Sequence, residues 1–284
     1  MKKSWRKHFF TLLKILISLG LLYFVYTKID WQLLKNEWKL SNKFYLFLAF
    51  ISFIISQIFS VLRVDFYFKK AGVHMSFANN ARLYLLGMFY NFFIPGGIGG
   101  DAYKVIALNR HYDQSVKTLT TAVFFDRFIG LCAIFILICL GIVFIPIDIP
   151  LWIKVLFFST GIIGALIGPA ILGRIFTKFK EAFYPTLLIS FIIQLFQIGT
   201  IVLALLATHP DHNIMVYVLI FLVSSVLSIV SFAGIGIRET VFYYAAQYLN
   251  FNPDISAGIA LIFSVITLIT SLFGAIYLFR KIKF

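Results

Sequence analysis

The sequence predicts an all-α, polytopic membrane protein: a helix bundle of about 7–8 spans with two broken or re-entrant segments. Hydrophobic residues make up 61% of the 284 residues, and mean hydropathy is +0.95. Charged residues make up 13%, whereas soluble domains carry about 25%. Because no polar segment approaches the roughly 50 residues of a small domain, residues 1–284 are expected to form a single integral membrane domain.

Three long spans and the first break are expected in the first half of the chain. Apolar runs cover residues 9–26, 44–62 and 119–145, and basic residues follow the second run at Arg63, Lys69, Lys70 and Arg82. Residues 83–108 are apolar around a glycine-rich centre and are followed by Arg110 and Lys117. Lys and Arg collect on cytoplasmic loops, so a segment that returns to the side it entered keeps both basic clusters cytoplasmic. We therefore predict a re-entrant segment here.

The second half is expected to hold further spans at residues 151–172, 186–208, 214–230 and 257–279. The turns at 145–150 and 209–213 carry no Lys or Arg and are predicted to lie outside. A second break at 231–239 precedes a short apolar stretch, residues 240–251. A basic C-terminus favours the cytoplasm, and the chain ends there only if this stretch carries it to the outer side before the last span. A full helical crossing needs about 20 residues, and this stretch is shorter. The side of the C-terminus therefore stays open.

The two breaks are the most informative features of the sequence. In a bilayer, irregular backbone persists only where protein or a water-filled cavity covers it, and transporters place substrate sites at such interrupted helices. Residues 97–101 and 234–238 share a Gly-Ile-Gly core followed by a charge. Breaks near 91–104 and 231–239 are consistent with a two-half internal repeat, although chance similarity explains so short a match equally well.

Charged residues at the breaks suggest an anion site. A helix that begins at residues 99–101 aims free backbone N–H groups at an anion, and Lys104 adds a charge within its first turn. Arg238 offers the planar fork that suits phosphate oxygens, and Glu239 is favourable at a helix start. The alternative interpretation is a packed kink at the first break, and a helix cap with a cytoplasmic anchor at the second.

Asp126 and Arg127 lie inside a predicted span, where charges are costly and usually face a cavity or pair with another helix. Neighbouring helical residues point about 100° apart, so these two are expected to have different partners. One hypothesis gives Arg127 the substrate phosphate and lets Asp126 hold Lys104 or Arg238. The alternative is a structural salt bridge between helices.

Several other functions find no support in the sequence. The net charge of +14 is explained by basic cytoplasmic loops, so nucleic-acid binding is not predicted. Nucleotide-binding glycine motifs and catalytic triads are absent, and no cofactor or metal is expected. Cys132 and Cys139 are interpreted as small buried hydrophobes, and His209 and His212 as part of a solvated turn.

Taken together, the motifs resemble those of the flippase-like family, the transmembrane region of lysylphosphatidylglycerol synthases and their stand-alone relatives. The resemblance rests on Gly87, Asn91, residues 95–104, Asp126-Arg127 and residues 234–239, with Lys104 where relatives often carry Arg. It implies a multi-pass protein of the cell inner (plasma) membrane, and the charge pattern around the first span predicts a cytoplasmic N-terminus. The sequence ends soon after its last predicted span, so the transferase domain is expected to be missing, and lysyltransferase activity is not predicted. Other relatives are linked to polyprenyl-phosphate sugar pathways.

The predicted function is a flippase-like transporter that translocates or presents an anionic phospholipid or a polyprenyl-phosphate-linked head group. The alternatives are a membrane-embedded subunit of a lipid aminoacyl- or glycosyl-transferase system and a non-catalytic membrane partner. Expected partners are membrane lipids with anionic head groups and a lipid-modifying enzyme; the oligomeric state stays open. The predicted substrate-binding residues are Asn91, Pro95, Gly96, Gly97, Gly99, Gly100, Asp101, Lys104, Asp126, Arg127, Gly234, Gly236, Arg238 and Glu239.

Overall fold

The computed structural model describes residues 41–93, 99–144, 149–208, 213–228 and 236–279, together with Gln32, Lys35, Trp38 and Lys39. These residues form helices and connecting turns with no β-strand, which confirms the all-α class. Five described helices are long and apolar enough to cross a membrane: α3 (Lys43–Lys70), α6 (Val116–Gly141, extended by η1, Ile142–Phe144), α7 (Leu151–Ile175), α8 (Phe183–Thr208, preceded by η2, Thr177–Ala182) and α11 (Pro253–Phe273). The span predicted at residues 9–26 lies outside the described residues.

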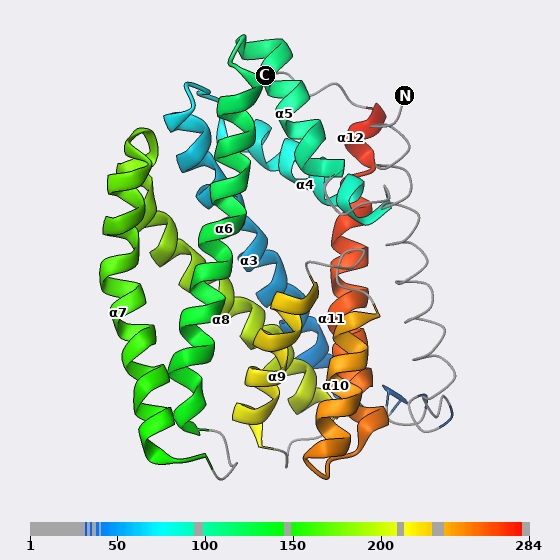
Figure 1. The fold of residues 1–284 in the computed structure, drawn as a ribbon. Coiled ribbons are helices and arrows are strands. Elements are labelled where there is room, and N and C mark those ends of the chain that lie inside the picture. Colours follow the sequence, from blue (N-terminus) through cyan, green and yellow to red (C-terminus); the bar gives the residue numbers. More distant parts are fainter. Residues whose placement is uncertain are drawn as a thin grey trace, which may run out of the picture.

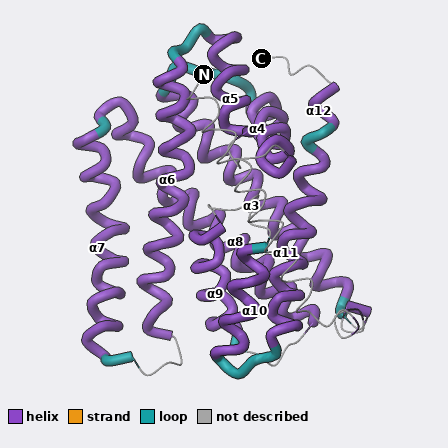
Figure 2. The backbone as a smooth tube through the Cα atoms, turned by 45° about the vertical axis from the view of Figure 1, so that its right-hand side comes forward, coloured by secondary structure: helices purple, strands orange, loops and turns teal. Residues whose placement is uncertain are grey.

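The long helices alternate in direction and give the bundle two distinct ends. In Figures 1 and 2, α3, α7 and α11 run upward, while α6 and α8 run downward. Basic residues gather at the upper end, at the close of α3, α5 and α7 and the start of α6: Lys69, Lys70, Arg110, Lys117, Arg174 and Lys178. We call this the basic end.

A helical hairpin enters the bundle from the basic end. It consists of α4 (Phe77–Phe93) and α5 (Gly99–Tyr112), and α5 returns to the end from which α4 set out (Figure 1). This α4–α5 hairpin is the re-entrant segment that the sequence predicts. It packs through α4 against α11 and through α5 against α6.

A second hairpin enters from the opposite end and corrects one predicted span. Residues 214–230 were expected to cross the membrane, but α9 (Ile214–Leu227) has only 14 residues and ends near the middle of the bundle (Figure 1). A crossing needs about 20 residues, so α9 is too short. From there α10 (Ile237–Tyr248) leads back to the end where α9 began. Consequently α11 runs to the basic end, where the short α12 (Ile276–Phe279) follows.

Local sequence signals set the starts of several helices. Asn42 caps α3 by accepting the N–H of Phe44 at 3.0 Å, and Ser115 caps α6 by accepting the N–H of Thr118 at 3.2 Å. Asn252 caps α11 immediately before a proline, which tolerates the first helical position because it lacks an N–H. These caps lie in the turns and leave the apolar runs free to pack.

Aromatic residues fill the core in two clusters. Near the basic end, the Phe125 ring packs against Phe183 of α8 with centroids 5.2 Å apart, and the buried Tyr67 hydroxyl bonds to Thr186. The second cluster surrounds the α9–α10 hairpin, where Phe221 packs on Phe263 at 5.0 Å. The helix α7, by contrast, turns most of its surface outward.

Candidate functional site

One carboxylate holds two cations at the start of α5. Asp101 lies in the first turn of this helix, and its Oδ1 is 3.4 Å from the Lys104 Nζ. Its other oxygen accepts a hydrogen bond from Nε of Arg127, on α6. We call these three residues the Asp101 cluster. With two positive charges on one negative charge, the cluster keeps an excess of one positive charge.

Burial differs across the Asp101 cluster. The side chains of Asp101 and Lys104 are 12% and 7% exposed, whereas that of Arg127 is 52% exposed. Arg127 therefore reaches from the protein surface inward to a buried carboxylate. Asp101 of the first break thus contacts both Lys104, from the same break, and Arg127, which was predicted as a substrate-binding residue inside a later span.

Glycines in α4 and α5 make room for the cluster. A Cβ atom added to Gly100 would overlap the carbonyl group of Gly87, so the two helices cross backbone against backbone. A Cβ on Gly87 would lie 2.6 Å from the Lys104 Cε, which shows that the lysine side chain runs over this glycine. Asn91 accepts the N–H of Gly100 at 2.8 Å and so caps the start of α5. The Lys104 Nζ also sits 4.7 Å from the Tyr84 ring centroid.

Asp126 pairs with an arginine that the sequence analysis did not select. Its oxygens lie 2.8 and 3.4 Å from Nε and Nη2 of Arg63, and Nη1 of that arginine donates to Ser190 at 3.1 Å. One hypothesis assigned Lys104 or Arg238 to Asp126, and this assignment is wrong, because Asp126 pairs with Arg63. As expected, however, Asp126 and Arg127 have different partners.

Arg63 was missed because it directly follows an apolar run and was read with the basic cytoplasmic cluster. The signal that identifies it is a stripe of small polar residues at helical spacing on the same helix, each of them buried: Ser52, Ser56 and Ser60. Such a stripe marks a polar helix face directed inward. Arg63 continues this face and is itself buried.

The charged pair at the second break forms a separate site. Glu239 accepts the N–H of Gly236 at 2.7 Å and a hydrogen bond from Ser264 at 2.5 Å, so each of its oxygens accepts one hydrogen bond. Arg238 instead lies against aromatic rings, with Cζ 4.4 Å from the Phe263 centroid. Among the described residues, no hydrogen bond or ion pair joins Arg238 to the Asp101 cluster. The two breaks therefore form two polar sites.

The remaining predicted site residues are placed as follows. Gly99 is the first residue of α5, and Gly236 caps α10 with a φ of 85°, a conformation that favours glycine. Pro95, Gly96, Gly97 and Gly234, as well as His209 and His212, lie outside the described residues. Within the described ranges, no group of three metal-ligating side chains occurs.

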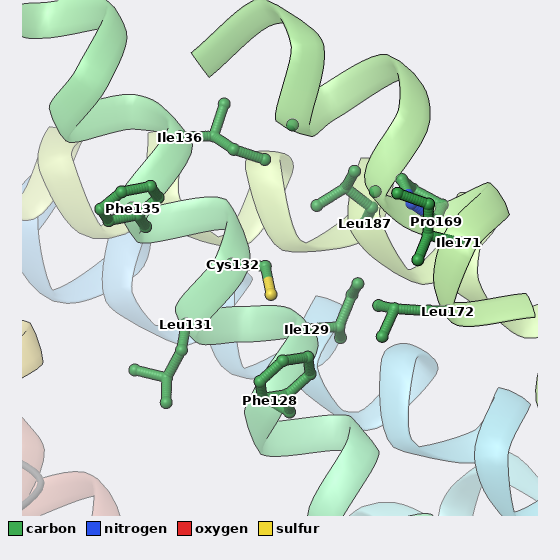
Figure 3. A pocket seen from close by; sticks show the side chains of 12 residues that line it. Phe128, Ile129, Leu131, Cys132, Phe135, Ile136, Pro169, Ile171, Leu172 and Leu187 are labelled. Carbon is green, nitrogen blue, oxygen red and sulfur yellow. The ribbon is translucent and has the colours of Figure 1, made fainter. Parts of the chain in front are cut away.

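An apolar cavity of about 430 Å³ lies between α6, α7 and α8. Figure 3 shows Ile129 and Cys132 of α6 facing Leu172 of α7 across it. The full lining is Phe128, Ile129, Leu131, Cys132, Phe135, Ile136, Gly164, Gly168, Pro169, Ile171, Leu172 and Leu187. Leu131, one of the lining residues, follows Arg127 by one helical turn on α6, so Arg127 lies on the basic-end side of this part of the lining. Both described cysteines are free thiols.

Comparison with known proteins places the chain in a family. A family model described as the lysylphosphatidylglycerol synthase TM region matches residues 11–274. A comparison with curated proteins gave no match. The matched range includes both hairpins, the Asp101 cluster and all five long helices in the described part of the chain. The chain therefore belongs to the lysylphosphatidylglycerol synthase TM region family and is a multi-pass membrane protein related to lipid modification or translocation.

Proposed function

We propose that the protein is a flippase-like transporter that translocates or presents an anionic phospholipid or a polyprenyl-phosphate-linked head group. The observation that carries this proposal is the Asp101 cluster, in which one carboxylate is shared between two cations. An unneutralised charge within a bilayer costs free energy, and a bound lipid phosphate would neutralise the surplus positive charge of this cluster. Arg127 is the residue that meets the phosphate, because half of its side chain is exposed.

The apolar cavity supports a lipid as the ligand. An anionic lipid combines a negative head group with acyl chains, and the protein presents an exposed cation one turn from a cavity lined almost entirely by carbon. Gly168 leaves open space on the α7 side, since a Cβ at this position would meet nothing within 4 Å. An acyl chain in the cavity would bring its head group toward Arg127.

The distribution of charge suggests a direction of access. Lys and Arg favour the cytoplasmic side, so the basic end would face the cytoplasm, in the inner membrane of the cell. The α4–α5 hairpin would then receive lipid from the cytoplasmic leaflet, and the α9–α10 hairpin would face the outer side. A span at residues 9–26 would place the N-terminus in the cytoplasm. A lipid-modifying enzyme that supplies the head group is the partner that this arrangement suits.

Transport can be measured in liposomes that contain the purified full-length protein. Fluorescent phosphatidylglycerol or a fluorescent polyprenyl phosphate is placed in both leaflets, and dithionite quenching reports the exchange between them. We expect Arg127→Ala to slow exchange at least about tenfold, the effect of losing about 1.4 kcal/mol. Arg82→Ala is the matched control, because Arg82 is exposed and hydrogen-bonds to Asn79 on its own helix.

Two results would replace this proposal. A chemically altered head group, detected by mass spectrometry of the extracted lipid, would identify an enzyme or an enzyme subunit. Absence of both exchange and chemistry, with a second membrane protein that co-purifies in fixed ratio, would identify a non-catalytic partner. Equal exchange rates for Arg127→Ala and wild type would remove the Asp101 cluster from the transport path.

A further inference from the structure

Within the part of the chain that the structure describes, Arg238 is a buried cation that forms no salt bridge. It is 7% exposed, and its Nε and Nη1 have no hydrogen-bond partner among the described residues. The other buried bases of the described chain are satisfied: Arg63 pairs with Asp126, and Lys104 pairs with Asp101. The neighbouring Glu239 contributes a nearby negative charge, but among the described residues no hydrogen bond or ion pair joins it to Arg238, and its oxygens accept from Gly236 and Ser264.

The surroundings of Arg238 stabilise it only in part. Its Cζ lies 4.4 Å from the Phe263 ring centroid and 5.8 Å from that of Phe221. Cation–π contacts of this kind attract a guanidinium but leave its in-plane N–H groups unpaired, and a buried charge with unpaired donors is strongly unfavourable. Arg238 also occupies the first turn of α10, where the helix dipole disfavours a cation and favours an anion. The unpaired N–H groups of Arg238 and its place at a helix N-terminus therefore favour a negatively charged acceptor beside it.

We propose that Arg238 binds the phosphate of a lipid head group and is a second anion site, separate from the Asp101 cluster. The inference rests on the proposed function, because it assumes that an anionic lipid enters the bundle. A guanidinium matches phosphate oxygens in charge and in the direction of its N–H groups. A single cation suits a singly charged phosphodiester, the anion that membrane phospholipids carry. Inorganic phosphate shares this chemistry, and the experiment separates the two sources.

The position of Arg238 gives this site its role. It lies at the start of α10, near the middle of the bundle and on the hairpin that enters from the end opposite the basic end (Figure 1). The two anion sites are therefore offered by two hairpins that enter from opposite ends. A head group that moves between the ends would leave the Asp101 cluster and meet Arg238, which forms no salt bridge with any described carboxylate.

Binding and thermal stability together test the proposal. Full-length protein is purified in detergent, stripped of lipid, and titrated with dioleoylphosphatidylglycerol, dioleoylglycerol or inorganic phosphate while Tm is recorded. We expect phosphatidylglycerol to raise the Tm of wild type and dioleoylglycerol to leave it unchanged. In an Arg127→Ala background, which removes the exposed cation of the Asp101 cluster, Arg238→Met should weaken the response to phosphatidylglycerol at least tenfold in concentration. Without lipid, the Tm of Arg238→Met should equal or exceed that of wild type, because a buried charge with unpaired donors is removed.

Controls keep the test decisive. Arg82→Met alters an exposed arginine and should respond as wild type does. If Arg238→Met does not fold, Arg238→Lys retains the charge without the fork and should bind phosphatidylglycerol more weakly while remaining folded. A lower Tm of Arg238→Met or Arg238→Lys with an unchanged response to phosphatidylglycerol would overturn the proposal and make Arg238 structural. A response to inorganic phosphate alone would overturn its lipid part. Because no transport is measured, Arg238-dependent binding with failed liposome exchange would reject the proposed function and leave the site intact.

Discussion

Asp126 and Asp101 are both buried, yet they hold their cations in different ways. Asp126 contacts Arg63 with both of its oxygens, and the same arginine also bonds to Ser190, so three helices meet at a closed and satisfied pair. Asp101 divides its oxygens between Lys104 and Arg127. The first arrangement is suited to holding α3, α6 and α8 together. The second leaves Arg127 half exposed, and in the proposed function this cation exchanges its carboxylate for a substrate anion.

The closed pair makes a prediction for stability. Asp126→Asn removes the charge that compensates Arg63, and breaking one partner of a buried pair costs about 3–5 kcal/mol. We expect a large drop in Tm in detergent, and recovery of most of it when Asp126→Leu is combined with Arg63→Met. Lys70→Gln is the control, because its partner Glu181 is 77% exposed and should contribute little. A small effect of Asp126→Asn would show that Arg63 finds another partner.

At the scale of residues, the sequence was informative wherever a charge interrupted an apolar run. Asp101 and Lys104 were selected on this ground and prove to be in contact, and Asp126 and Arg127 were expected to have separate partners. Position alone argued against an inward Arg63, because a base at the end of a span more often faces lipid head groups, and only the serine spacing on the same helix indicated otherwise. It also could not show which acid holds which base, because that depends on how distant helices pack.

At the scale of elements, glycines decide where helices approach each other. In the α4–α5 hairpin, the close contact of Gly87 with Gly100 leaves no room for a side chain. In α7, Gly168 faces open space instead. The two positions therefore tolerate the same substitution very differently.

Gly100→Ala should destabilise the protein, whereas Gly168→Ala should not. The first substitution forces α4 and α5 apart, and overpacking typically costs about 1–3 kcal/mol. The second adds a methyl group to empty space in a helix, where Ala is favoured over Gly by about 1 kcal/mol. Tm measurements on the two variants under identical conditions test this pair. A fall in Tm for both would mean that helix packing around Gly168 is closer than described.

The cavity beside α6 offers a test of its own. Gly168→Phe should fill it from α7 without displacing neighbours and should slow lipid exchange severalfold, because the acyl chain loses its place. Ile163→Phe, at an exposed position of the same helix, is the matched control. Protection of Cys132 from an apolar maleimide by added phosphatidylglycerol, in a Cys139→Ser background, reports occupancy directly. Unchanged exchange in Gly168→Phe would exclude the cavity from the path.

The elements also show where hydropathy alone is insufficient. The first break was recognised as re-entrant because the basic residues on its two sides had to lie on the same side. Residues 214–230 contain no Lys or Arg that could indicate the side of either end, and the apolar run continues past the end of α9 at Leu227. A half-crossing helix and a full span have the same composition there. Only the three-dimensional structure separates them.

At the scale of the whole molecule, the two hairpins enter from opposite ends. The order of long helix, hairpin, long helix occurs twice: α3, α4–α5 and α6, then α8, α9–α10 and α11, with the directions of the long helices reversed (Figures 1 and 2). This arrangement resembles the inverted repeats of transporters that bind substrate near the centre of the membrane. The internal repeat suggested by the two Gly-Ile-Gly cores stays a prediction.

Orientation in the membrane can be tested with cysteines in a Cys132→Ser, Cys139→Ser background. Lys117→Cys lies at the basic end and Tyr248→Cys at the opposite end, and both positions are exposed. If the basic end is cytoplasmic, an impermeant maleimide should label Tyr248→Cys in intact cells and Lys117→Cys only after lysis. The reverse pattern would invert the proposed direction of access.

The outward surface of α7 determines how the molecule should be handled. Only 11% of the most apolar stretch of α7 is buried against other parts of the protein. The helix contacts α6 at Gly161, where an added Cβ would lie 3.1 Å from the Cβ of Cys139. Lipid tails are as apolar as such a helix, so the surrounding bilayer provides most of the apolar contacts that neighbouring helices provide for the rest of the bundle. Short-chain detergent replaces the bilayer with a less well-matched apolar environment. Nanodiscs of native thickness are therefore the setting in which the position of α7, and with it the width of the adjoining cavity, should be measured.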